Sequence, residues 1–186
     1  MAVTAAGTPY VESSDNVADY PGVSLALANH IDSLDGGKVL QVVSVTKVDT
    51  FTTTSASYID ITGLTATITP SATSSKILVI FNVSINNANG QIGIVQLLRG
   101  STVIGGGTAV GSRGSAFASQ FTNTSEGTGS IGGTFLDSPA TTSAETYKIQ
   151  ARVSAGTMRV NTTASDGDTS TQPRTSSTIT LMEISA

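Results

Sequence analysis

The sequence contains no cysteine, no tryptophan and a single histidine, His30. The absence of cysteine excludes disulfides and thiolate metal sites, so packing, or association with other copies, has to supply all the stability. Nucleophilic triads of the Ser–His or Cys–His type would all have to use His30. Because a lone histidine is far more often structural than a ligand, we predict neither a catalytic nor a metal-binding role for it.

Charge is also scarce. Charged residues make up 12% of the chain, and the formal net charge is −4 with nine scattered basic residues. This pattern gives no positive footprint for DNA or RNA. No apolar run approaches the roughly 18 residues needed to cross a bilayer, and the N-terminus lacks the basic and apolar parts of a secretory signal. We expect a soluble protein, assembled in a cytoplasm, that binds neither nucleic acid nor a membrane.

The chain divides at about residue 37. Residues 1–37 read as a poorly hydrophobic arm that orders only against a partner. After Ser24 the apolar residues fall at helical spacing up to Gly36-Gly37, which predicts one short helix. Its apolar stripe must lie on the rest of the protein or on the helices of neighbouring copies. The arm residues predicted to dock are Pro9, Tyr10, Val11, Tyr20, Pro21, Leu27, Ile31 and Leu34.

Residues 38–186 read as a β-body, with short strands between turns rich in Ser, Thr and Gly. The most hydrophobic strand, 76–85, is apolar on both faces, which favours the middle of a sheet or a subunit interface. Eight or more strands at this spacing predict an all-β, jelly-roll-like antiparallel sandwich whose strand order the sequence does not fix. Further strands are predicted at 38–47, 57–61, 65–69, 91–99, 102–104, 146–153, 158–160 and 177–184.

Three details of the β-body are also predicted. Gly63 should form a turn between the strands 57–61 and 65–69, and 158–160 should pair with 146–153 across Ala155-Gly156. The glycine-rich segment 105–145 should hold shorter strands and long loops. Its inward-facing residues should be Phe117, Phe121, Ile131 and Phe135.

Glycan cleavage needs paired carboxylates, and the few candidates considered for it are acidic residues of the second half. Most of them lie in turn-like sequence, so cleavage is a remote alternative, and we predict no enzymatic activity and no cofactor. Asp166-Gly167-Asp168 resembles a fragment of a calcium loop but lacks its other ligands. We predict no metal site, with Asp166 and Asp168 as the only candidates. The acidic residues considered as candidates are Asp137, Glu145, Asp166, Asp168 and Glu183.

Both ends of the chain resemble the virion structural proteins of tailed bacteriophages, including tail fibres, short fibres and decoration-type proteins. The resemblance rests on segments 8–15, 20–26 and 37–43 of the start and on 177–184 of the ending. It implies that residues 1–37 attach the protein to other virion proteins and that residues 38–186 form a trimeric jelly roll. Many members have a shaft before the terminal domain, whereas here the β-body starts directly after Gly37.

Two roles stay open within this resemblance. Loops 105–130 and 164–175, rich in Ser, Thr, Asn and Gly, are suited to recognising a host surface glycan or protein through weak contacts repeated three times. The other role is architectural: a fibre adaptor, a capsid decoration or cement protein, or a head fibre. Sugar sites usually stack a ring against the sugar, and the absence of tryptophan therefore favours attachment slightly. In either role the protein is located on the virion.

Overall fold

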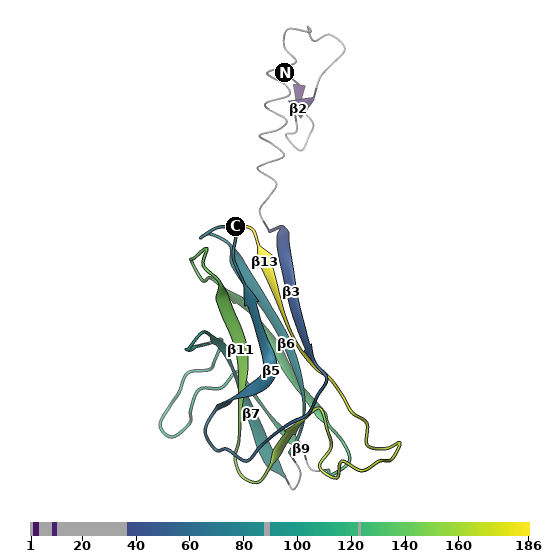
Figure 1. Ribbon diagram of the computed structural model, residues 1–186. Helices are drawn as coiled ribbons and strands as arrows, with labels where there is room; N and C mark the ends of the chain where they lie inside the picture. The colour runs from purple at the N-terminus through teal and green to yellow at the C-terminus, as the bar shows by residue number, and fades with distance from the viewer. Residues whose placement is uncertain (1, 4–8, 11–36, 88–89, 123) are drawn as a thin grey trace.

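The computed structural model describes residues 2–3, 9–10, 37–87, 90–122 and 124–186 (Figure 1). In the arm, β1 (Ala2–Val3) pairs antiparallel with β2 (Pro9–Tyr10). The helix predicted after Ser24 lies outside the described residues, as do His30 and the other docking candidates, Val11, Tyr20, Pro21, Leu27, Ile31 and Leu34. Within the described ranges, no helix is long and apolar enough to cross a membrane.

The β-body consists of two antiparallel sheets, which confirms the predicted all-β class. The six-stranded sheet contains β3 (Val39–Lys47), β13 (Ser177–Ile184), β6 (Lys76–Asn86), β12 (Met158–Val160), β4 (Phe51–Thr53) and β10 (Gly129–Asp137). The five-stranded sheet contains β5 (Ile59–Ile68), β11 (Glu145–Val153), β7 (Gln91–Arg99), β8 (Thr102–Ile104) and β9 (Ala118–Thr122).

Pairing between the strands follows one rule. Strands β3, β5, β6 and β7 pair with β13, β11, β10 and β9 respectively, so the first half of the body pairs with the second half in reverse order. Two further ladders, β13 with β6 and β11 with β7, join these pairs into the two sheets. The sheets lie face to face in Figure 1. The short strands β4 and β12 pair with each other beside the end of β6.

The core lies between the two sheets. Alternation along β6 buries Ile77, Val79, Phe81, Val83 and Ile85, because successive side chains of a strand point to opposite faces. Strand β11 buries Tyr147, Ile149, Ala151 and Val153 in the same way, as its alternation predicts. Strand β6 has β13 on one side and β10 on the other, which confirms its predicted central position.

Gly63 does not separate two strands as predicted. Strand β5 continues through it from Ile59 to Ile68, and both halves pair with the same partner, β11. The register shifts there: Thr65 pairs with Lys148, and Asp60 pairs with Gln150. Gly63 has a φ of +83°, a conformation that glycine adopts without steric cost. The glycine therefore marks a bulge within one strand.

The partner predicted for strand 158–160 is also wrong. Strand β12 pairs with β4 and with the end of β6, and not with β11. The turn at Gly156 carries the chain from one sheet to the other, so β11 and β12 belong to different sheets. The short connection at Ala155-Gly156 is typical of a hairpin. It contains no information about which sheet the second strand joins.

The glycine-rich segment 105–145 contains one full-length strand, β10, where shorter strands were predicted. A Cβ on Gly132 would lie 2.5 Å from the Phe81 carbonyl oxygen, so the close approach of β6 requires glycine there. Phe117, Ile131 and Phe135 pack on the core, and the Phe117 ring meets Phe81 edge to face at 4.9 Å. Phe121 instead faces outward with 58% of its surface exposed, which corrects its predicted inward position.

A buried carboxylate joins the end of the chain to two other segments. Glu183 of β13 is fully buried. It accepts hydrogen bonds from the backbone N and Oγ of Ser71, each at 2.6 Å, and from Gln41 Nε2 at 2.6 Å. Burial raises the pKa of this carboxyl group, but the bonds from Ser71 and Gln41 outweigh burial and lower the pKa to about 2.

Replacing Glu183 with Gln should lower the free energy of unfolding at pH 7 by about 2 kcal/mol, because charge-assisted hydrogen bonds are lost. In the native protein this contribution is complete above the ordinary pKa of 4.5 and is lost as the pH falls toward 2, since the folded state has the lower pKa. Urea unfolding between pH 7 and 2 should show a shallower acid slope for Glu183→Gln. An unchanged slope, or an equal loss in the exposed control Glu126→Gln, would contradict this role.

Candidate functional site

The two ends of the sandwich are built differently. Ile184, near the C-terminus, pairs with Lys76 at the start of β6, whereas Arg159 of β12 pairs with Asn86 at its end. At about 3.4 Å per residue, these two positions lie roughly 30 Å apart along β6. The start of β3 and the C-terminus lie together at the first end (Figure 1). We call the other end, with Arg159, the distal end.

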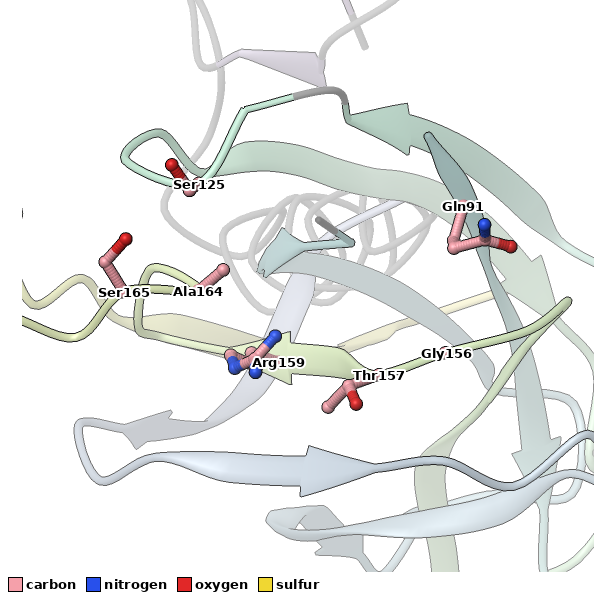
Figure 2. A pocket seen from close by; sticks show the side chains of 7 residues that line it. All are labelled: Gln91, Ser125, Gly156, Thr157, Arg159, Ala164 and Ser165. Atoms are coloured by element: carbon pink, nitrogen blue, oxygen red, sulfur yellow. The ribbon is translucent and has the colours of Figure 1, made fainter. Parts of the chain in front are cut away.

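A cavity of about 370 Å³ lies at the distal end (Figure 2). We call it the distal cavity. Its residues come from the start of β7, from β12 and from three connections, those between β9 and β10, β11 and β12, and β12 and β13. None of the described lining residues is acidic or aromatic. They are Gln91, Ser125, Gly156, Thr157, Arg159, Ala164 and Ser165.

Hydrogen bonds fix the loop that carries Ser125. The backbone N atoms of Ala164 and Ser165 donate to the Ser125 carbonyl oxygen at 3.0 and 3.2 Å. On the other side, the Asn86 Nδ2 donates to the carbonyl oxygens of Thr124 and Gly127. Asn86 is fully buried and is the cross-strand partner of Arg159. The loop is therefore held by β6 and by the β12–β13 connection at the same time.

The turn between β11 and β12 is held against β7. Ser154 exchanges two hydrogen bonds with Ile92: its backbone N donates to the Ile92 carbonyl oxygen at 3.0 Å, and its Oγ accepts from the Ile92 backbone N at 3.1 Å. Gly156 in this turn has a φ of +68°. A Cβ on it would lie 3.4 Å from Gln91 Cγ, so the turn and the start of β7 are in close contact at the cavity wall.

Asn161, directly after β12, organises the base of the distal loops. It is fully buried with a φ of +61°. Its Nδ2 donates to the carbonyl oxygens of Lys47 and Asp49 at 2.9 and 3.0 Å, and its Oδ1 accepts from Ser177 Oγ at 2.6 Å. One side chain thus joins the end of β3, the start of β13 and the β12–β13 connection.

The metal candidates Asp166 and Asp168 line a second hollow of about 310 Å³ in the β12–β13 connection. The Asp166 carboxylate accepts from Thr162 Oγ1 at 2.6 Å and is ion-paired with Arg174 at 2.8 Å. These contacts hold the connection in shape. In the part of the chain that the structure describes, no group of three or more His, Asp or Glu residues could hold a metal ion.

The other acidic residues considered for glycan cleavage lie away from the distal cavity. Asp137 accepts from Arg99 Nη1 and from the Tyr147 hydroxyl, each at 2.7 Å, and thereby joins β10 of one sheet to β7 and β11 of the other. Burial and the Asp137 bond raise the pKa of Tyr147 well above its usual range. Glu145 lies 4.0 Å from Arg99, and Glu183 belongs to the buried cluster described above. These contacts account for each group structurally.

Neither Arg159 nor Gln91 is among the site residues predicted from the sequence. Ser125, Ala164 and Ser165 do come from the two loop segments considered for recognition, 105–130 and 164–175. Arg159 occupies the outward position between the buried Met158 and Val160, as any surface residue of a strand would. The only signal for Arg159 in the sequence is the alternation of this strand. It predicts that the arginine faces outward, close to the turn at Gly156 and to the loop that follows the strand.

An apolar band crosses the outer face of the six-stranded sheet. Val42, Met182, Leu78 and Leu136 are successive cross-strand partners on β3, β13, β6 and β10, and Ile80 lies in the next row. Val42 and Leu136 are 54% and 50% exposed. Cross-strand partners share one face, so these residues form a continuous stripe without a charged member. We call these five residues the apolar band.

Comparison with solved structures gives distant likenesses. No protein-family model and no curated protein matches the chain. The chain is similar to a chain of the infectious bursal disease virus VP2 subviral particle, with 15% identity, a TM-score of 0.35 and coverage of 78% of this chain and 38% of that one. It is also similar to a chain of T=1 particles derived from infectious bursal virus, with 13% identity, a TM-score of 0.36 and coverage of 78% of this chain and 36% of that one.

Each of those chains is therefore much longer than this one. At TM-scores this low, the likeness decides nothing about function.

Replacing Asn161 should weaken the distal end measurably. Asn161→Gly removes the side-chain hydrogen bonds but tolerates the positive φ, and it should lower the free energy of unfolding by about 2 kcal/mol. Asn161→Ala should cost about 1 kcal/mol more, because a Cβ is strained in that conformation. Guanidinium unfolding monitored by circular dichroism measures both losses. Wild-type stability of Asn161→Gly would show that these bonds contribute nothing.

Proposed function

We propose that this chain is a non-enzymatic virion structural protein. Residues 1–37 attach it to other virion proteins, and residues 38–186 form a β-domain that is displayed as a homotrimer. The observation that carries the proposal is the apolar band, because it gives the β-body a surface suited to contact with another copy. The resemblance of both ends of the chain to tailed-phage virion proteins supports the same role.

We infer that the β-body is a jelly roll. In that architecture one long antiparallel hairpin is rolled into two sheets, so that early strands pair with late strands in reverse order. The pairs β3 with β13, β5 with β11, β6 with β10, and β7 with β9 follow this order. Folds of this kind host many unrelated functions, so the order supports the architecture and not the role by itself.

A second copy is the occupant we infer for the apolar band. Each chain carries a net charge of −4, so contact between copies is favoured where charge is absent. The apolar band has that property, and its neighbours on one side, Ser44, Thr180 and Thr134, are neutral as well, whereas Lys76 lies at its other side. A contiguous exposed apolar surface is also the usual mark of an interaction site. Three copies whose apolar bands face a common three-fold axis would need no disulfide.

The position of the arm supports attachment at one end and display at the other. Gly37 and Lys38, which directly follow the arm, are tied to the C-terminal segment: Gly37 N donates to the Ser185 carbonyl oxygen at 3.0 Å, and Ser185 N donates to the Lys38 carbonyl oxygen at 2.9 Å. The arm therefore joins the β-body at the end opposite the distal cavity. A protein anchored through residues 1–37 can present its distal loops outward.

The architecture suits more than one place on a virion. A tail-fibre or adaptor position with host-surface recognition uses the distal loops, whereas a capsid decoration, cement or head-fibre position uses only the arm and the apolar band. Strand β3 begins two residues after Gly37, without an intervening shaft. That compactness favours a short adaptor or a decoration protein over a long fibre. Glycan cleavage remains the remote alternative.

Deleting residues 1–37 should abolish incorporation into particles while leaving a folded β-body, because every long strand lies between Val39 and Ile184. The measurement is quantitative immunoblotting of purified particles from cells that express the truncated or the full-length chain. Circular dichroism of the truncated protein provides the folding control. Incorporation of a folded, truncated chain at the full-length level would refute the assigned division of labour.

Placing a charge in the apolar band should break the homotrimer. Val42→Glu and Leu136→Glu each put a carboxylate on an exposed position that the proposal buries between copies, where an unpaired charge is costly. Light scattering coupled to size-exclusion chromatography should show a trimer for the native chain and a smaller species for both variants. Val110→Glu, on an exposed loop outside the apolar band, is the matched control. A monomeric native chain, or variants that remain trimeric, would contradict the proposal.

A further inference from the structure

We propose that the distal cavity binds an acidic sugar unit, with the anionic group held by Arg159 and the sugar hydroxyls held by the polar residues around it. The biological meaning of this inference, contact with a host surface, rests on the proposed function. The binding itself does not, because it depends only on the cavity.

Arg159 differs from most of the other basic residues in what surrounds it, and Lys76 and Arg113, which likewise have no ion pair among the described residues, do not line the distal cavity. Lys47, Arg99, Lys148 and Arg174 are each ion-paired with a carboxylate, and Arg152 lies 5.2 Å from the centre of the Tyr58 ring. Arg159 forms no ion pair with any carboxylate of the described residues, and it lines a cavity where no described lining residue is acidic. Its planar guanidinium matches carboxylate and phosphate in a two-pronged hydrogen-bond geometry.

The rest of the lining suits a ligand that carries hydroxyl groups. Ser125, Thr157 and Ser165 contribute hydroxyls, and Gln91 contributes an amide whose Oε1 accepts from Ser154 Oγ at 3.4 Å. Each of these groups both donates and accepts hydrogen bonds, which is the chemistry that pairs with a sugar hydroxyl. A volume of about 370 Å³ lies at the small end of ligand cavities and favours a single sugar unit over an extended chain.

The lack of aromatic side chains in the described lining and the negative net charge restrict the class of ligand further. None of the described lining residues is aromatic, so a neutral hexose has no ring to stack on and a nucleotide base has no platform. A polyanion such as nucleic acid is disfavoured by the net charge of −4. The anionic contact to Arg159 must therefore supply most of the discrimination, and the ligand we infer is small, singly acidic and rich in hydroxyls.

The walls of the cavity are fixed by contacts already present. The Ser125 loop is held by Asn86 and by the backbone of Ala164 and Ser165, and the Gly156 turn is held on β7 by Ser154. Asp166, two residues from Ala164, is occupied by Arg174 and does not compete for Arg159. A site that is already ordered loses less entropy on binding. Each site should still be weak, and three copies would add avidity.

The test is a nuclear magnetic resonance titration of the ¹⁵N-labelled full-length chain with four compounds. They are glucuronic acid, glucose 6-phosphate, glucose and inorganic phosphate. Glucuronic acid and glucose 6-phosphate are both acidic sugars, but the acidic group is a carboxylate in one and a phosphate in the other. The compound that binds with the higher affinity therefore identifies the preferred anionic group. We expect saturable shifts at the lining residues for at least one of them, and binding at least tenfold weaker for glucose and for inorganic phosphate.

Variants of Arg159 provide the second arm. Arg159→Gln should weaken binding of the acidic sugar at least tenfold, and Arg159→Lys should weaken it less, because lysine keeps the charge but loses the planar geometry. Arg113→Gln removes an exposed arginine outside the cavity and should leave binding unchanged. An unchanged dispersion of amide signals shows that each variant is folded.

Several outcomes would overturn the inference. They are equal binding of glucose, equal binding of inorganic phosphate, which would indicate an anion site only, and undiminished binding by folded Arg159→Gln. Failure of this titration leaves arm attachment and trimer formation intact, because those are measured on particles and by light scattering. Conversely, a chain that binds the acidic sugar but does not enter particles would overturn the proposed function alone.

Discussion

Backbone pairing between strands far apart in the sequence is the constraint on which the rest of the structure depends. A two-sided sandwich can bury its apolar faces only after β3, β5, β6 and β7 have found β13, β11, β10 and β9. Ser44 and Thr180, which hydrogen-bond at 2.8 Å, lie 136 residues apart in the chain. With no cysteine to fix such contacts covalently, the pairing is stabilised by the core of apolar side chains between the sheets. It also places the start of the β-body beside the C-terminus and gathers the distal loops at the other end.

Buried polar clusters connect segments that the apolar core does not hold together. Glu183 holds the first end of the sandwich together, Asp137 links the two sheets, and Asn161 organises the distal loops. Each side chain makes more than one hydrogen bond, and each joins segments that are remote in sequence. Buried polar groups of this kind favour one arrangement over others because a misplaced partner leaves a group unpaired. The walls of the distal cavity are held by Asn86, by the backbone of Ala164 and Ser165 and by Ser154, so its geometry is a property of the fold and not of any single loop.

Much of the fold could be predicted from the sequence, because strand alternation is a local signal. The strands predicted at 76–85, 91–99, 146–153 and 177–184 are present, with bounds that differ by at most one residue. Strand order and partners could not be predicted, since they depend on contacts across the whole chain, and β12 was assigned to the wrong neighbour for that reason. The predictions for Gly63 and Phe121 were wrong for another reason. A glycine at a bulge cannot be distinguished by sequence from a glycine at a turn, and an outward-facing phenylalanine cannot be distinguished from one in the core. The candidate site was predictable only as loops, because Arg159 has no local signature, whereas Asp166, which has one, is paired with Arg174.

We propose above all that this protein is a component of a virion, held by its arm with its β-domain on the outside. Immunogold electron microscopy of intact tailed-phage particles from cells that produce the protein tests this claim most directly, with an antibody raised against residues 38–186. The account predicts gold on the particle surface. Label at the tail or fibre tips would correspond to adsorption, and label over the head would correspond to decoration. Unlabelled particles, with all of the protein in the particle-free fraction, would contradict the account.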